Sequence, residues 1–143
     1  MTFTIEGQAV PQGRPRFTRY GHAYDPEKSR DYKEQVALAA SLAMRGQDVF
    51  AKGTPLKCVI TIWQKMPARF TKKQKELAEA EILRPTTKPD ADNLAKAITD
   101  AMNGIVYADD AQIVELNCGK FYGAEPRVMV TVDLADEKKD KAK

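Results

Sequence analysis

Residues 89–104 read PDADNLAKAITDAMNG and carry the clearest helical pattern in the chain. Apolar side chains recur there every three or four positions, which is typical of an amphipathic helix with one buried face. We expect the helix to span residues 92–103, because Gly104 favours the left-handed conformation that often ends helices. The predicted buried stripe consists of Leu94, Ala97, Ile98, Ala101 and Met102.

Four regular elements are expected before this helix. Residues 3–9 alternate apolar and polar side chains, the period of a half-buried strand. Residues 25–46 predict a helix that begins with Asp25 as N-cap and a first-turn proline. Residues 56–66 predict a strand that is apolar on both faces and therefore central in its sheet. Residues 71–83 open with a capping box and predict a short charged helix.

Two further strands are expected after it. Residues 112–122 and 127–134 have the composition of strands, and the Gly- and Pro-containing segment 123–126 between them predicts an antiparallel hairpin. Residues 105–107 predict a short extended segment. The expected fold class is α+β, with one domain over residues 1–134. Its mixed β-sheet has a C-terminal antiparallel hairpin and packs against about three helices.

The composition is that of one globular domain. The chain has 143 residues, of which 43% are hydrophobic and 30% charged, with two cysteines and one histidine. A disulfide framework and a histidine-based zinc site are therefore not expected. Residues 135–143 are charged and predict a disordered tail. No signal peptide, membrane span, P-loop or G-x-G-x-x-G sequence is present, so we expect a cytoplasmic protein without a nucleotide cofactor.

Charge is distributed unevenly along the chain. Residues 89–115 contain six acidic side chains and one lysine, whereas the whole chain has a net charge of +3. An acidic island in a basic protein indicates a metal held against a polyanion, although such blocks are also common as solvated faces and surface loops. The candidate DNA-binding residues are Arg14, Arg16 and Arg19 in a Pro- and Gly-rich arm, and Arg69, Lys72 and Lys73 in a second basic stretch.

Acidic side chains flank the predicted helix. At 100° per residue, Asp92, Lys96 and Asp100 project from the face opposite the apolar stripe. Asp90 precedes them at the junction between loop and helix. Residues 109–110 add two aspartates after a glycine at which the chain can reverse and run back along the helix. The sequence therefore predicts a cleft with up to four carboxylates around one lysine.

Such a cleft favours Mg²⁺. Adjacent carboxylates repel one another, which raises the pKa of at least one of them, and a divalent ion that prefers oxygen ligands removes this repulsion. Bound Mg²⁺ activates water and polarises a phosphodiester. Lys96 would stabilise charge on the scissile phosphate or position the attacking water.

Each of these residues also has a simpler interpretation. Asp90 or Asp92 alone would serve as a helix cap. Residues 109–110 alone would form an ordinary Asx turn. Lys96 would pair with an aspartate four residues away on the same face. These alternatives remain open at the level of the sequence.

Two motifs stand out in the acidic region: D-x-D-N-x-x-K at residues 90–96 and D-D-x-Q at residues 109–112. Together they resemble the RusA family of Holliday-junction resolvases. The opening residues 3–17 are similar to a phage and prophage branch of that family. The resemblance extends over roughly residues 2–134.

This resemblance implies a small homodimeric endodeoxyribonuclease that depends on Mg²⁺, with Mn²⁺ as a substitute. It would cut four-way DNA junctions symmetrically in recombination and repair, in a bacterial or phage-infected cell. The family's catalytic, metal-binding aspartates match Asp90, Asp92 and Asp110, and its essential lysine matches Lys96. The neighbouring positions that would support the site are Asn93, Asp100 and Asp109.

Two other functions are compatible with parts of the sequence. A DNA-binding accessory protein would keep the fold without turnover, although the complete set of acids and lysine argues against this. Another Mg²⁺-dependent DNA nuclease, of the PD-(D/E)xK kind, would account for Pro89-Asp90. That alternative ranks low, because no acid-x-lysine pair follows at the expected spacing.

Overall fold

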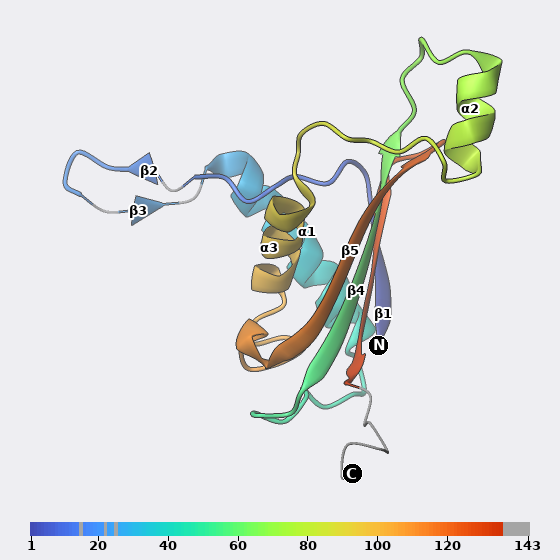
Figure 1. Ribbon diagram of the computed structural model, residues 1–143. Coiled ribbons are helices and arrows are strands. Elements are labelled where there is room, and N and C mark those ends of the chain that lie inside the picture. Colours follow the sequence, from blue (N-terminus) through green and yellow to red (C-terminus); the bar gives the residue numbers. More distant parts are fainter. Residues whose placement is uncertain (15, 22, 25, 136–143) are drawn as a thin grey trace, which may run out of the picture.

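The computed structural model describes residues 1–14, 16–21, 23–24 and 26–135 (Figure 1). Of the expected tail, it describes Ala135 alone, and the predicted N-cap Asp25 lies outside the described residues. The elements are β1 (Thr2–Glu6), β2 (Arg16–Phe17), β3 (Ala23–Tyr24), α1 (Glu27–Ala43), β4 (Leu56–Lys65), α2 (Lys72–Glu79), α3 (Ala91–Ala101), the 3₁₀ turn η1 (Asp110–Gln112), β5 (Ile113–Gly123) and β6 (Arg127–Leu134).

The main sheet has four strands in the order β1-β6-β4-β5. Strand β4 pairs parallel with β5 and antiparallel with β6, and β6 pairs antiparallel with β1. The predicted α+β class with a mixed sheet is confirmed, and so is the central position of β4. The connection from β4 to β5 runs through α2 and α3, as a parallel pair requires a crossover.

The predicted C-terminal hairpin is wrong in its pairing. Strands β5 and β6 run antiparallel, but β4 lies between them. The short connection after β5 therefore crosses the end of β4, where the Met66 amide donates to the Gly123 carbonyl (3.2 Å) and the Gly7 amide to the Pro126 carbonyl (3.0 Å). Turn residues mark where a chain reverses, but they do not specify which strand occupies the neighbouring position.

Helices α1 and α3 cover one face of the sheet (Figure 1). The apolar stripe predicted for α3 is confirmed, since most of its side chains are fully buried in the core, where α3 packs against α1 and β5. No helix in the described ranges has both the length and the apolarity needed to cross a membrane. The fully buried residues of this layer include Leu94, Ile98 and Met102 of α3, Val36 of α1, and Leu56, Ile60 and Ile62 of β4.

The segment after α3 differs from the extended piece expected at residues 105–107. It forms a tight turn in which the Gly104 amide donates to the Tyr107 carbonyl (2.7 Å) and the Val106 amide to the Met102 carbonyl (3.1 Å). Val106 and Tyr107 are fully buried, and the Tyr107 hydroxyl donates to the Thr99 carbonyl (2.6 Å). Burial of these side chains holds residues 108–112 at the C-terminal end of α3.

Two other parts of the chain differ from the sequence-based expectation for local reasons. Strand β1 ends at Glu6 rather than at residue 9, because Gly7 has a φ of 98° and turns the chain. The arm around Pro11 and Gly13 was not expected to contain regular structure, but β2 and β3 form a short antiparallel pair that projects from the body of the molecule (Figure 1).

The capping box predicted for α2 is confirmed. The Thr71 hydroxyl accepts from the Gln74 amide (3.2 Å), and the Gln74 side chain accepts from the Thr71 amide (2.8 Å). We expect Thr71→Ala to lower the free energy of unfolding by about 1 kcal/mol, the usual effect of losing an N-cap. Urea denaturation measures this, with the exposed Thr87→Ala as control. Equal losses in the two variants would contradict the prediction.

Candidate active site

Two predicted acids lie at the start of α3 with their carboxylates exposed. Asp90 is the N-cap residue, and its carbonyl accepts from the Leu94 amide (3.1 Å), but its side chain makes no capping hydrogen bond. Asp92 lies in the first helical turn and is exposed. The simpler interpretation of Asp90 as a side-chain cap is therefore wrong. Both carboxylates remain available to a ligand, beside a helix N-terminus that favours negative charge.

The loop before α3 is held by a lysine that the sequence patterns did not single out. Lys120 of β5 donates from Nζ to the carbonyls of Thr87 (2.8 Å) and Pro89 (2.9 Å). Arg84 donates to the Lys120 carbonyl (2.9 Å), and its guanidinium lies 4.0 Å from the centroid of the Phe121 ring. These contacts fix the backbone immediately before Asp90. Only the register of β5 places Lys120 there, so no local motif signals its role.

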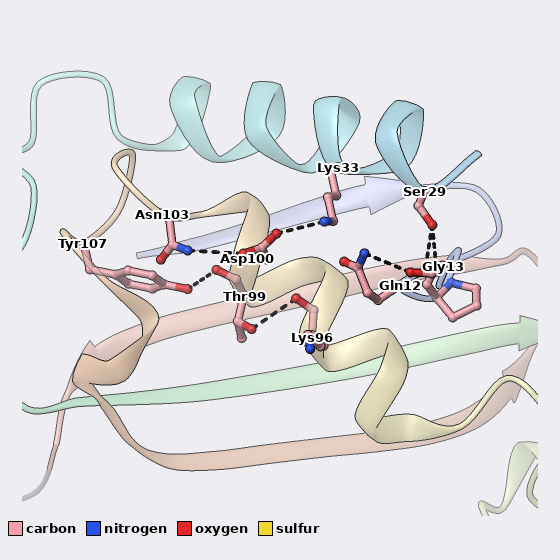
Figure 2. A network of polar contacts seen from close by, with 10 residues as sticks. Gln12, Gly13, Ser29, Lys33, Lys96, Thr99, Asp100, Asn103 and Tyr107 are labelled. Atoms are coloured by element: carbon pink, nitrogen blue, oxygen red, sulfur yellow. Dashed lines mark hydrogen bonds and ion pairs between the residues drawn. The ribbon is translucent and has the colours of Figure 1, made fainter. Parts of the chain in front are cut away.

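A chain of polar contacts organises the other end of α3 (Figure 2). Lys33 of α1 forms an ion pair with Asp100 (Nζ to Oδ2, 2.8 Å), and Asn103 donates to the same carboxylate (3.4 Å). The Asn103 side-chain oxygen in turn accepts from the Asp110 amide (2.8 Å). Lys33 and Asn103, which the sequence analysis did not select, thus link Asp110 to α1. Asp100 is engaged by Lys33 rather than by Lys96.

Asp109 has a structural role. It caps the 3₁₀ turn η1, where its carboxylate accepts from the Ala111 amide (3.3 Å) and the Gln112 side chain accepts from the Asp109 amide (3.2 Å). The turn interpretation therefore holds for this residue. The Gln112 side chain also donates to the carbonyls of Ala51 and Thr54, which ties the turn to the loop before β4.

The half-buried Asp110 lies in an unfavourable environment for a negative charge. Burial, a hydrogen bond with Asp109, and the charges of Asp109 and Asp100 raise the pKa of Asp110 above its ordinary value. A hydrogen bond with Asn103 acts in the opposite direction on this pKa. Such a carboxyl is a candidate for a functional group, because folding holds it where its charged form is disfavoured.

We expect Asp110→Asn to raise the midpoint temperature of unfolding at pH 7 in EDTA. Because folding raises the pKa of Asp110, the folded state binds more protons than the unfolded state, and stability falls as pH rises through the window between the two pKa values. The increase in midpoint temperature caused by Asp110→Asn should become smaller as the pH falls towards about 3.9, the ordinary aspartate pKa. Calorimetry across this range is the measurement. A midpoint at pH 7 equal to that of the parent protein would contradict the prediction.

The two acidic groups lie at opposite ends of α3. Asp92 and Asp100 are eight residues apart, which corresponds to about 12 Å along a helix. Across the described residues, no three His, Cys, Asp or Glu side chains form a group that could hold a metal ion. The expected convergence of Asp90, Asp92 and Asp110 therefore does not occur within one protomer. The buried turn after α3 is the reason, since it keeps Asp110 at the C-terminal end of the helix. The chain runs back along α3 only afterwards, in β5, where Lys120 reaches the Pro89 carbonyl.

Lys96 lies on the exposed face of α3, where it lines a cleft together with Asn93 and Asp100. Within the described ranges, no carboxylate lies within 4.0 Å of its Nζ, so the proposed pairing with Asp92 or Asp100 is not formed. Asn93 also lines a neighbouring cleft that contains Asp90. Lys96 and the exposed acids at the start of α3 thus share one surface of the molecule.

The predicted DNA-binding residues fall in two places. Arg14 and Arg19 lie on the arm, where the Arg19 guanidinium stacks on Tyr20 at 5.0 Å from the ring centroid. The Arg16 side chain is outside the described part of the structure. Arg69 lies before α2, and Lys72 and Lys73 are exposed in its first turn. Figure 1 shows the arm and α2 projecting from opposite sides of the sheet.

Comparison with known proteins identifies a family for this chain. Residues 6–133 match the family described as Endodeoxyribonuclease RusA. The chain is also 44% identical to "Uncharacterized protein YqaN" of Bacillus subtilis (strain 168) over 135 residues, which cover 91% of this chain and 93% of that protein. The family match takes in α1, β4, α3, β5 and both acidic groups, so the chain belongs to the RusA family of endodeoxyribonucleases.

Proposed function

We propose that this protein resolves four-way DNA junctions by paired symmetric nicks in recombination and repair. Family membership supports endodeoxyribonuclease chemistry. The observation that carries the proposal is the start of α3, where Asp90 and Asp92 expose carboxylates that no described residue engages. One turn later Lys96 presents an ammonium without a carboxylate partner in the described ranges. Acids that attract a cation and a lysine that attracts a phosphate then face the same substrate.

Mg²⁺ is the proposed metal, with Mn²⁺ as a substitute. Mg²⁺ sites often use one or two carboxylates, with water and substrate phosphates completing the coordination. Asp90 and Asp92 fit such a set, whereas Asp110 does not join them within the protomer. When bound, the ion would activate water and polarise the phosphodiester. The protein's own contribution is to fix the backbone that carries the two carboxylates, through Lys120 and α3, and to present Lys96 on the same surface.

The decisive experiment is cleavage of a mobile four-way junction with and without Mg²⁺, with the nicks mapped on all strands. We expect nicks at symmetric positions on opposing strands, each leaving a 5′-phosphate, and little cutting of a linear duplex of the same sequence. Junction binding without product under Mg²⁺ or Mn²⁺ would instead indicate an accessory DNA-binding protein. Equal cutting of linear and branched DNA would indicate a general nuclease.

The proposed active form is a homodimer. A four-way junction has near-twofold symmetry, and a C₂ dimer presents two identical sites to it. In such a dimer, Asp110 of one protomer would contribute to the acids of the other, since its own start of α3 is too distant. A mixture of inactive Asp92→Asn and Asp110→Asn proteins tests this. Recovered nicking in the mixture supports a site shared between protomers, and its absence, with mixed dimers demonstrated, refutes it.

A further inference from the structure

A cleft of about 540 Å³ separates the arm from α1 and α3. Three of its lining side chains are cationic, Arg14, Lys33 and Lys96, and one is anionic, Asp100. Asp100 is already paired with Lys33, whose side chain is only 15% exposed. In the described part of the chain, neither Arg14 nor Lys96 has a carboxylate within ion-pair distance. The described lining of the cleft therefore carries an excess of about two positive charges in a partly enclosed space, which favours an anion.

The cleft is built by specific backbone contacts rather than by mobile side chains alone (Figure 2). The Gln12 amide donates to the Asn93 carbonyl of α3 (3.1 Å), and the Gly13 amide donates to the hydroxyl of Ser29 on α1 (2.6 Å). The Ser29 hydroxyl donates onward to the Pro11 carbonyl (3.1 Å), and Ser29 is only 2% exposed. The arm is thus attached to both helices immediately before Arg14.

Gly13 is required for this close approach. A Cβ atom built at this position would lie 2.7 Å from Cγ of Pro26 and 2.7 Å from Oγ of Ser29. Any side chain would therefore push the arm away from α1 and widen the cleft. The close packing at Gly13 fixes the place of Arg14 relative to Lys33 and Lys96.

We infer that this cleft binds one phosphate group, and that in the working enzyme the phosphate belongs to the backbone of the junction DNA. The identity of the DNA rests on the proposed function, whereas the phosphate chemistry rests on the cleft itself. Arg14 and Lys96 supply donors that no carboxylate of the described residues engages, and Arg in particular suits phosphate oxygens because its fork can donate two hydrogen bonds. Lys33 adds charge from the inner wall, where it also holds Asp100. Lys96 lies about one helical turn after Asp92 on α3, so a phosphate bound there would align the strand with the exposed acids.

The first test measures binding of a four-way junction in EDTA, where cleavage does not interfere. On duplex DNA, the logarithm of the association constant falls linearly with the logarithm of the salt concentration. Each phosphate contact contributes about 0.9 to the magnitude of this slope. We expect Arg14→Gln to lower this slope by about 0.9 and to weaken binding about five- to tenfold near 0.1 M salt. Lys33→Gln should also weaken binding, because it leaves the Asp100 carboxylate unbalanced in the cleft. Arg30→Gln is the matched control, because Arg30 is exposed on α1 and does not line the cleft. Thermal unfolding of every variant confirms that it is folded.

The second test uses inorganic phosphate alone. The backbone amide resonances of Gln12, Gly13 and Asn93 should shift and saturate with phosphate in the parent protein but not with chloride at equal ionic strength. Arg14→Gln, which changes an exposed side chain, should abolish the saturation. Absence of saturable shifts together with unchanged salt slopes would overturn the inference.

The remaining outcomes distinguish failure of the assignment of the phosphate to DNA from failure of the proposed function. Saturable phosphate shifts with unchanged junction binding in both variants would overturn the assignment to DNA and leave a site for free phosphate. Failure of the parent protein to bind any junction would refute the proposed function. The phosphate titration would then decide the inference by itself.

Discussion

Asp92→Asn is expected to abolish junction cleavage while leaving junction binding intact or tighter. Loss of one essential proton-transfer or charge-stabilising group typically lowers a rate by about 10²–10⁴-fold. Asp92 lies in the first turn of α3 with its carboxylate exposed, so the substitution removes a charge without disturbing the core. Binding should not suffer, because a neutral asparagine repels the DNA backbone less than an aspartate does. Single-turnover cleavage and gel-shift titration measure the two effects separately.

The control for this prediction is Asp48→Asn, which removes an exposed carboxylate from the loop after α1. It should cleave at the parental rate. If purified Asp92→Asn also nicks junctions at the parental rate, the assignment of the α3 start as the catalytic surface is wrong. A parallel loss of cleavage and binding in Asp92→Asn would instead point to misfolding, which thermal unfolding reveals.

Asn103→Leu is expected to lower cleavage about 10–100-fold, the usual range when a group that orients a site residue is lost. Asn103 accepts from the Asp110 amide and donates to Asp100, so leucine breaks the connection from Lys33 to Asp110 at its centre. We expect it to act as a positioning residue, because its side chain contacts the Asp110 amide and the Asp100 carboxylate. Leucine is similar in size, and Asn103 is exposed, so the fold should persist.

A pH titration distinguishes positioning from simple destabilisation. The hydrogen bond from Asn103 lowers the pKa of Asp110, in opposition to burial and the neighbouring acids. Its loss should move the pKa of Asp110 further upward, as followed by carboxyl NMR in EDTA. Asn117→Leu, an exposed substitution on β5, should change neither this pKa nor the cleavage rate. An unchanged pKa of Asp110 in Asn103→Leu would contradict the proposed role.

Local patterns in the chain were sufficient for the class of fold and for the elements that carry the site. The spacing of Leu94, Ile98 and Met102 predicted α3 and its buried face, because a helix repeats every 3.6 residues and one stripe must face the core. The two apolar faces of β4 predicted its central position. The motif around Asp90 and Asp92 identified the surface on which the proposed chemistry rests, since these acids and Lys96 are separated by only one or two helical turns.

Contacts between distant parts of the chain determined the order of the strands, the separation of the acids and the partners of two lysines. The insertion of β4 between β5 and β6 depends on how whole strands compete for neighbours, which neither turn residues nor periodicity encode. The separation of Asp110 from Asp92 follows from burial of Val106 and Tyr107, which keeps the turn at one end of α3. Lys33 and Lys120 reach the site across 67 and 31 positions of sequence, to Asp100 and Pro89 respectively. Their roles depend on packing between elements, because a side chain's partner is set by distance in space and not by spacing along the chain.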